Sequence, residues 1–248
     1  MGHHLSKTRY VQGLQCEKQL WLACNKPEER SEYDQATLDI FERGTIVGEM
    51  AAGTYPGSVG LFPGGVLIAG GKGYLDRAGA VSETQRAISN GAHTIYEAAF
   101  FYDNVYVFAD IFTRMARRKN EAGEWELYDQ GHWDLYEVKS TGSVHEQHKP
   151  DIGVQYWVCS SVGYRPAKAG LVYIAGSQGM CLTHPWEHFG IEDLTGTCQS
   201  IQGEVASDVS RFNRMIAGDE PQVGRGPHCR KPYECLFQAY CTRLEAEA

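Results

Sequence analysis

The centre of the chain contains three segments rich in β-branched and aromatic residues, and this feature constrains the fold most. The segments are residues 94–101, 105–115 and 133–140. Turn sequences separate them, with Tyr-Asp-Asn at 102–104 and Glu-Ala-Gly at 121–123. Strand-like segments joined by short turns favour antiparallel pairing. The sequence therefore predicts a β-meander at the centre of the protein.

Helical periodicity on both sides of this centre extends the prediction to an α/β fold, with a mixed central sheet flanked by helices. Ser6 and Ser82 are expected to begin two of the helices as N-caps. A glycine-rich stretch at 57–73 lacks the Gly-Lys-Ser/Thr of a nucleotide-binding loop, so turns and a short strand are expected there. A short strand is expected at 169–175, and an irregular tail from Pro221. The expected helices are residues 5–24, 33–52, 82–89, 151–162 and 191–216.

The length of 248 residues suits one domain, and 42% hydrophobic with 22% charged residues is typical of a globular protein. No apolar run approaches the roughly 20 residues that span a bilayer, and the first residues lack the apolar core of a secretion signal. We therefore expect a cytoplasmic protein without a membrane partner. The net charge of −8 argues mildly against nucleic-acid binding, although a local basic groove is compatible with it.

The sharpest local motif is Glu137-Val138-Lys139, in the third strand-like segment. Side chains alternate between the faces of a strand, so Glu137 and Lys139 are expected on one face and Tyr136 and Val138 on the other. A carboxylate and an ammonium at the end of a buried strand are costly unless something compensates them. A divalent metal ion and a phosphate group together do so. The alternative is a surface ion pair between positions i and i+2, because Glu-x-Lys also occurs by chance.

Asp110 is the second candidate, because it is an ionisable residue inside the otherwise apolar segment 105–115. If this strand pairs with that of Glu137, the two carboxylates meet at one end of the sheet. Two carboxylates suit Mg²⁺ or Mn²⁺ in metal-assisted phosphodiester hydrolysis. Lys139 would then contact the attacking water or the charge of the transition state.

Asp110, Glu137, Lys139 and the downstream Gln155 together resemble the RecB-like branch of the PD-(D/E)XK nucleases. The resemblance implies a restriction-endonuclease-like core in which Asp110 and Glu137 bind the metal ion. It also implies that Lys139 and Gln155 complete the catalytic set, with Gln155 on a helix that lines the DNA-binding side.

Several positions depart from the pattern of that branch. The tyrosine usually found four residues after the glutamine is replaced by Cys159, while Tyr156 follows the glutamine directly and is expected to pack within its helix. The histidine of an early-helix Gly-x-x-x-His pattern is replaced by Gly48. Glu49, next to it, is an optional metal ligand or a solvated helix carboxylate. Glu97, on the strand before Asp110, is interpreted in the same way.

Three of the eight cysteines, Cys229, Cys235 and Cys241, are evenly spaced in the last 20 residues. Three convergent thiolates require a fourth ligand, for which Cys16 is the strongest candidate. Disulfides are not expected in a chain without a secretion signal. The other cysteines are expected to be free and buried, namely Cys24, Cys159, Cys181 and Cys198.

One N-terminal and three C-terminal cysteines also resemble the iron–sulfur nucleases of the RecB-like branch, including the AddB-type and CRISPR-adaptation enzymes. The resemblance implies a [4Fe–4S] cluster on the four thiolates. Structural zinc is the alternative, although the Cys-x₂₋₄-Cys pairs common in zinc sites are absent from the sequence. Residues 1–30 and 221–248 would then form a cluster subdomain of a single nuclease domain, residues 1–248, with residues 31–220 as the nuclease core.

The combined motifs predict a metal-dependent deoxyribonuclease, an exonuclease acting on single-stranded DNA or DNA ends. One alternative is a non-catalytic DNA-binding or assembly module that retains the nuclease fold, since the early histidine is absent. Another is a redox iron–sulfur protein unrelated to DNA. Polarity, exonuclease versus endonuclease behaviour, strand preference, oligomeric state and pathway stay open, with repair, recombination and CRISPR adaptation as the expected settings for protein partners.

Overall fold

The computed structural model describes residues 3–68, 76–175 and 185–247. Within these residues the strands form one mixed sheet of seven strands. The strands are β1 (Leu5–Ser6), β2 (Val66–Leu67), β3 (Thr94–Tyr102), β4 (Val105–Lys119), β5 (Trp125–Val138), β6 (Lys168–Ile174) and β7 (Phe189–Asp193). Their order is β2-β3-β4-β5-β6-β7, with β1 paired to β4. The prediction of an α/β protein with a mixed central sheet is confirmed.

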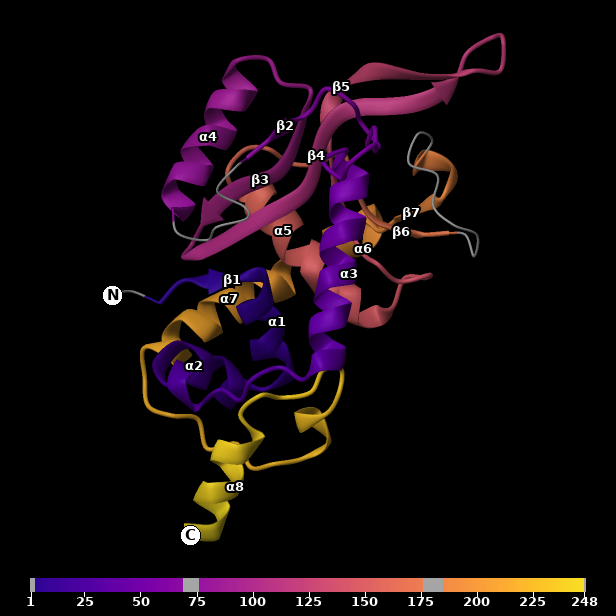
Figure 1. Cartoon of the computed structure of the whole chain (residues 1–248). Helices are drawn as coiled ribbons and strands as arrows, with labels where there is room; N and C mark the ends of the chain where they lie inside the picture. The colour runs from indigo at the N-terminus through magenta and orange to yellow at the C-terminus, as the bar shows by residue number, and fades with distance from the viewer. Residues whose placement is uncertain (1–2, 69–75, 176–184, 248) are drawn as a thin grey trace.

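The predicted meander is the middle of this sheet, because β3, β4 and β5 pair as antiparallel neighbours. On either side of it, β2 runs parallel to β3 and β6 runs parallel to β5, while β7 closes the sheet antiparallel to β6. The β3–β4 turn places Asp103 and Asn104 at positive φ, 44° and 66°, which is the geometry of a two-residue hairpin turn. The long β4–β5 hairpin extends away from the rest of the molecule (Figure 1).

Helices cover the sheet on both faces. They are α1 (Lys7–Gln15), α2 (Glu17–Asn25), α3 (Gln35–Ala52), α4 (Arg77–Ser89), α5 (Lys149–Ser161), α6 (Thr195–Ser200), α7 (Gln202–Ile216) and α8 (Gln238–Glu247). Short 3₁₀ turns occur at Pro27–Glu29, Glu146–His148, Pro185–Glu187 and Pro227–Cys229. None of the helices in the described part of the chain is long and apolar enough to cross a membrane.

The larger core lies between the sheet and α5, with α1 and α7 packed behind. Nine residues of α5, from Asp151 to Cys159, are buried, so this helix has almost no solvent face. The second core lies on the other face, where Val47 of α3 packs with Tyr96, Ile111 and Tyr136. Val138 packs against this second core as well. The predicted separation of Tyr136 and Val138 from the face of Glu137 is therefore confirmed.

Two predicted helix boundaries in the N-terminal half are wrong. The expected helix 5–24 is divided, because Cys16 is in an extended conformation between α1 and α2, and Leu5–Ser6 forms β1. The Ser6 cap is confirmed, with its hydroxyl accepting from the backbone N–H of Arg9 at 3.2 Å. The helix expected from Ser82 begins earlier, because Asp76 accepts from Gly79 N–H at 2.7 Å and caps α4.

Three boundaries in the second half also differ from the prediction. β5 begins at Trp125 rather than at 133, because its first residues pair with the end of β4. Ile191 belongs to β7, where it pairs with Val172, so the helical region begins only at α6. The tail expected to be irregular from Pro221 ends in α8. The glycine-rich stretch does contain the expected short strand, β2, while its residues 69–73 lie outside the described part of the chain.

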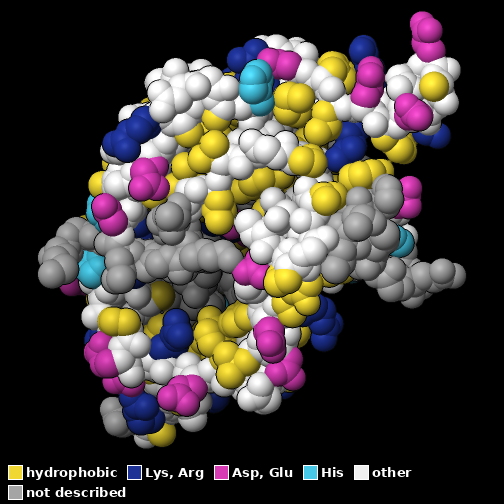
Figure 2. All heavy atoms as spheres, turned by 45° about the horizontal axis from the view of Figure 1, so that its top comes forward, with side chains coloured by type: hydrophobic (Ala, Val, Ile, Leu, Met, Phe, Trp, Pro, Cys, Tyr) yellow, Lys and Arg dark blue, Asp and Glu magenta, His cyan; other side chains and the backbone are white. Residues whose placement is uncertain are grey.

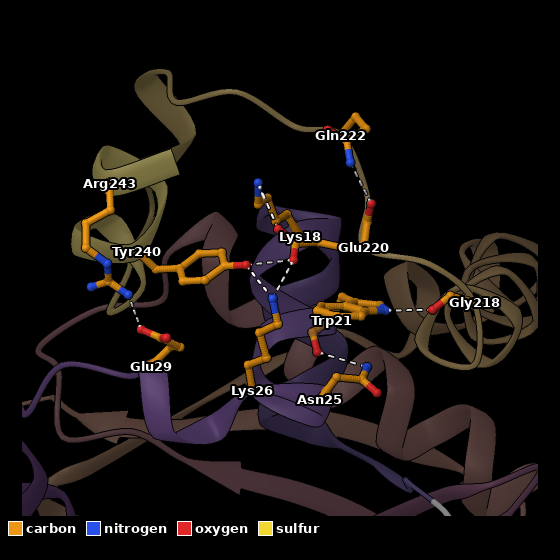
Figure 3. A network of polar contacts seen from close by, with 10 residues as sticks. All are labelled: Lys18, Trp21, Asn25, Lys26, Glu29, Gly218, Glu220, Gln222, Tyr240 and Arg243. Carbon is orange, nitrogen blue, oxygen red and sulfur yellow. Dashed lines mark hydrogen bonds and ion pairs between the residues drawn. The ribbon is translucent and has the colours of Figure 1, made fainter. Parts of the chain in front are cut away.

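The two ends of the chain pack against each other below the sheet (Figure 1). A small core joins Leu22 of α2 to Cys229, Cys235, Phe237 and Tyr240 of the tail. A polar network surrounds this core and is drawn in Figure 3. In it, Lys18 and Lys26 each lie 3.1 Å from a carboxylate oxygen of Glu220, and the hydroxyl of Tyr240 donates to Glu220 at 2.8 Å.

Candidate active site on the central sheet

Three carboxylate residues lie side by side on neighbouring strands of the meander. Tyr96 pairs with Ile111 and Ala98 with Ala109, which places Glu97 of β3 opposite Asp110 of β4. Ile111 in turn pairs with Tyr136, which places Asp110 beside Glu137 of β5. The predicted meeting of Asp110 and Glu137 is therefore a consequence of strand register.

Glu97 has a backbone conformation that few residues other than glycine adopt. Its φ is +56°, in the middle of a β-strand. Such strain persists only where the surrounding structure enforces it, and it occurs preferentially at functional sites. This conformation occurs at the position of β3 that lies opposite Asp110.

Asp110 is tied to the end of β5 by its own side chain, because Oδ2 accepts a hydrogen bond from the backbone N–H of Val138 at 2.7 Å. Burial and the neighbouring charge of Glu137, against the opposing charge of Lys7, together raise the pKa of Asp110 to about 8. A positive charge brought to this carboxyl group would stabilise its anion.

Glu137 is the centre of the site and is almost completely buried. Its Oε1 accepts from the ammonium of Lys139 at 2.8 Å and from that of Lys7 at 2.6 Å, and its Oε2 accepts from Nε2 of Gln155 at 2.8 Å. Burial alone would raise the pKa of Glu137, but the charges of Lys139 and Lys7 outweigh it, so the pKa is lowered. Glu137 is therefore a carboxylate at every physiological pH.

Lys139 follows β5 directly and is held between two anions, Glu137 and Asp151. Burial would lower its pKa, but the charges of Glu137 and Asp151 together outweigh burial and raise it. Lys139 is therefore an ammonium that can donate hydrogen bonds and stabilise negative charge, and it cannot act as a general base.

Gln155 and Asp151 lie one turn apart on α5 and face the sheet. The side chain of Gln155 has no exposed surface, and its Nε2 also donates to the carbonyl of Asp151 at 3.0 Å. Its Oε1 has no hydrogen-bond donor, although it is buried. A buried amide oxygen without a donor is costly, so this atom is a ready acceptor for a water or a metal-bound group. These contacts bring Gln155 together with Glu137 and Lys139, as the sequence predicted.

Three residues of this site are not predicted from the sequence. Lys7 is expected only as part of a helix, and Asp151 only as a helix start. His148, at the N-cap of α5, is buried, and its pKa is lowered first by burial and then by the charge of Lys139. An ionisable residue in the first turn of a helix that also carries Gln155 is the signal that could have identified Asp151. Lys7 has no comparable signal, because its neighbours in sequence carry no motif.

Of the two optional metal ligands, Glu97 is brought to the site, since its charge acts on Asp110. Glu49 lies on α3, half-buried, on the helix that covers the opposite face of the sheet from α5. No group of three or more His, Cys, Asp or Glu side chains in the described ranges has the geometry to hold a metal ion as it stands. The residues fit a divalent ion by chemistry, because Glu97, Asp110 and Glu137 on neighbouring strands supply hard oxygen ligands.

The cysteine cavity

The four cysteines predicted to act together line one small cavity between α2 and the tail. Cys16, Cys229, Cys235 and Cys241 all border it, together with Lys18 and other residues. Burial, with a smaller contribution from the other three thiols, raises the pKa of Cys235 to about 11. The thiols are thus close enough to influence one another, although their side chains are not arranged around a common metal position.

The donor set of this cavity fits a metal group bound by thiolates. Burial raises the pKa of Cys16, and the backbone N–H groups of Gln19 and Lys18, at the start of α2, lower it. Lys18 also lowers the pKa of Cys241, against burial. Burial outweighs these contacts, so the pKa of both thiols is raised overall. The thiolate that binds iron or zinc would therefore be stabilised by the metal itself. The remaining cysteines were expected to be free and buried, which is confirmed for Cys24, Cys159 and Cys198; Cys181 lies outside the described residues.

The cysteine-bearing loop also reaches the carboxylate site. Gln15, at the end of α1, donates through Nε2 to the carbonyl oxygens of His228 and Tyr233, both at 2.7 Å. Burial raises the pKa of Tyr233, and the charge of Asp151 is the next largest cause. The side chain of Tyr233 is nevertheless 42% exposed. The loop between Cys229 and Cys235 therefore presents an aromatic ring to solvent beside the catalytic candidates.

On the face of the molecule in Figure 2, Lys and Arg side chains are interspersed with Asp and Glu rather than gathered in one basic area. Two of the four basic residues of the β4–β5 hairpin are paired with carboxylates. Arg118 lies 2.7 Å from Glu126, and Arg114 lies 3.1 Å from Asp129. These two pairs reduce the positive charge that the hairpin could offer to a phosphate backbone.

Comparison with known protein families, and with curated proteins, finds no match for this chain.

Proposed function

We propose that the protein is a metal-dependent deoxyribonuclease of the PD-(D/E)XK type that hydrolyses phosphodiester bonds of single-stranded DNA or of DNA ends. The observation that carries this proposal is the grouping of Asp110, Glu137 and Lys139 around the buried Gln155. Side chains from two strands and one helix converge there, and a surface ion pair between neighbouring positions does not account for such a set.

Asp110 and Glu137 would hold Mg²⁺ or Mn²⁺, with Glu97 as a further oxygen ligand. Such an ion supplies a water of lowered pKa and draws charge from the phosphoryl oxygens. Lys139, fixed by Glu137 and Asp151, donates toward the attacking water or the pentacovalent phosphate. Gln155 orients Glu137 through Nε2 and offers its free Oε1 to a water. Burial on the α5 side excludes competing solvent.

We propose further that Cys16, Cys229, Cys235 and Cys241 hold a [4Fe–4S] cluster, with zinc as the alternative. The group would serve structure, because it would link residues 1–30 to residues 221–248. Linking segments so far apart in sequence is where a cross-link restricts the unfolded chain most. Metal analysis and a visible absorption spectrum of protein purified without oxygen distinguish iron–sulfur from zinc.

The nuclease proposal is tested with purified protein, Mn²⁺ and end-labelled single-stranded DNA. Glu137→Gln should lose cleavage, because the amide removes a charge needed at the metal site. Glu192→Gln, at an exposed position of β7, is the matched control and should cleave as the native protein does. Equal cleavage by Glu137→Gln and the native protein would contradict the proposal.

A non-catalytic DNA-binding module is the second candidate, because Gly48 replaces the early-helix histidine of the family that this chain resembles. In that case the native protein binds single-stranded DNA but leaves it intact with every divalent ion tested.

A further inference from the structure

The backbone fixes Lys7 beside the carboxylates. β1 pairs with β4 through Leu5 and Val105, and Ser6 then caps α1, of which Lys7 is the first residue. Lys7 therefore enters the site from the N-terminal segment, next to β4. Its side chain retains 24% of its exposure, while its ammonium lies against Glu137 and within reach of the charges of Asp110 and Asp151.

Lys7 and Lys139 share one oxygen of Glu137, but they are held differently. Lys139 is fixed from its other side by Asp151. Among the described residues, Lys7 forms its ion pair with Glu137 alone. The other oxygen of Glu137 accepts from Gln155. These three donors occupy most of the acceptor positions of Glu137, so a metal ion that binds this carboxylate competes with the two ammonium groups. Lys7 is the donor with the least additional anchoring.

The net charge of the site indicates a role for Lys7 once its ammonium has left Glu137. Four carboxylates and two ammonium groups meet here, and a divalent ion balances the two excess negative charges. Removal of one lysine would leave the loaded site negative, and it would then repel a phosphodiester. The groups are Glu97, Asp110, Glu137, Asp151, Lys7 and Lys139.

We propose that Lys7 is a second active-site lysine, which leaves Glu137 when a divalent ion binds and then contacts a backbone phosphate of the DNA strand. This inference rests on the proposed nuclease function. Lysine suits the role because its ammonium is a compact charge on a flexible stem, and it can move between a carboxylate and a phosphate without a change of backbone.

The test compares Lys7→Met and Lys7→Arg with Lys168→Met, which removes an exposed lysine at the start of β6. Calorimetry measures Mn²⁺ binding without DNA. Fluorescence anisotropy measures binding of a labelled oligothymidine over a series of salt concentrations, with Ca²⁺ to slow cleavage. Circular dichroism checks the fold, which should persist because Lys139 and Gln155 still satisfy Glu137.

Lys7→Met should shift the two affinities in opposite directions. Mn²⁺ should bind several-fold more tightly, because a competing cation is gone. DNA should bind about tenfold more weakly, and the slope of log K against log salt should fall by about 0.7, the share of one phosphate contact on a single strand. Lys7→Arg should keep the native slope, and Lys168→Met should change neither affinity.

A purely structural role for Lys7 would weaken both affinities together or change neither, and either result overturns the inference. A native protein that neither binds nor cleaves DNA overturns the proposed function itself. The two failures are therefore distinguishable in one set of measurements.

Discussion

The ammonium of Lys7 lies 2.6 Å from Oε1 of Glu137, although 130 residues separate the two in sequence. Lys7 is the first residue of α1, and this helix ends at Gln15. The side chain of Gln15 donates to the carbonyl oxygen of Tyr233, and Cys16 follows directly in sequence. With a rise of about 1.5 Å per residue, the nine residues of α1 extend about 13 Å. One short helix thus joins the carboxylate site to the cysteine cavity.

Lys139→Ala should reduce cleavage by about a hundredfold or more, because a preorganised positive donor is lost while the metal ligands stay in place. The measurement is the single-turnover rate with Mn²⁺ at saturating protein. Lys168→Ala serves as the control for loss of a lysine. A Lys139→Ala rate within about twofold of native would exclude a catalytic role for this residue.

Asp151→Asn should lower the cleavage rate by roughly tenfold, because it removes the anion that fixes Lys139 without removing a metal ligand. The pH–rate profile supplies the distinguishing readout. Lys139, no longer paired with Asp151, should lose its proton at lower pH, so the fall of the rate in alkaline solution should begin earlier. An unchanged profile would assign Asp151 to stability alone.

The pKa of Asp110, raised to about 8, predicts how stability depends on pH without metal. The folded protein holds this proton more tightly than the unfolded chain. The contribution of Asp110 to the free energy of unfolding is therefore fully present below the unfolded value of 3.8 and is lost as pH rises through about 8. Urea unfolding in EDTA should show that Asp110→Asn gains stability relative to the native protein as the pH rises over this window. A difference in the free energy of unfolding between the two proteins that stays constant with pH would contradict the prediction.

Binding of a divalent ion should displace the same proton. Mn²⁺ affinity should therefore increase as pH rises toward 8, and calorimetry in buffers of different ionisation enthalpy should register proton release. Asp110→Asn should remove both effects. Proton release that persists in this variant would assign the titrating group elsewhere.

Cys235→Ser should abolish the visible colour and bound iron, and should lower stability markedly, because the small core of the tail depends on this cavity. Cys159→Ser is the matched control, since Cys159 is also buried but lies on α5 in the main core. Loss of DNA cleavage in Cys235→Ser with Asp110, Glu137 and Lys139 intact would reflect displacement of α1 and Tyr233. Full retention of iron in Cys235→Ser would exclude it as a ligand.

The meander could be predicted from sequence, because β-branched segments and short turns determine strand pairing locally. The positions of Glu137, Lys139 and Asp110 follow from it. Glu137 and Lys139 are two residues apart, so strand geometry alone brings them together. The meeting of Asp110 with Glu137 can be predicted with one further assumption, which is that their two strands are neighbours. The start of α4 is not predicted, because its first turn has no apolar periodicity. The helix begins there because Asp76 caps it.

The rest of the site depends on tertiary packing that leaves no local pattern. Lys7 reaches Glu137 only because β1 pairs with β4, and a two-residue strand has no detectable alternation. Tyr233 lies within the electrostatic reach of Asp151 on a loop whose backbone accepts a hydrogen bond from Gln15. The φ of +56° at Glu97 is imposed by the neighbouring strands and is not encoded by glycine or asparagine at that position.

The most direct test of the proposed nuclease is cleavage of end-labelled single-stranded DNA by the native protein and by Asp110→Asn, each with Mn²⁺ and each with EDTA. We predict degradation by the native protein with Mn²⁺ alone, and none by Asp110→Asn under either condition. Degradation that persists in EDTA, or that is equal in Asp110→Asn and the native protein, would contradict a metal-dependent nuclease with Asp110 in its active site.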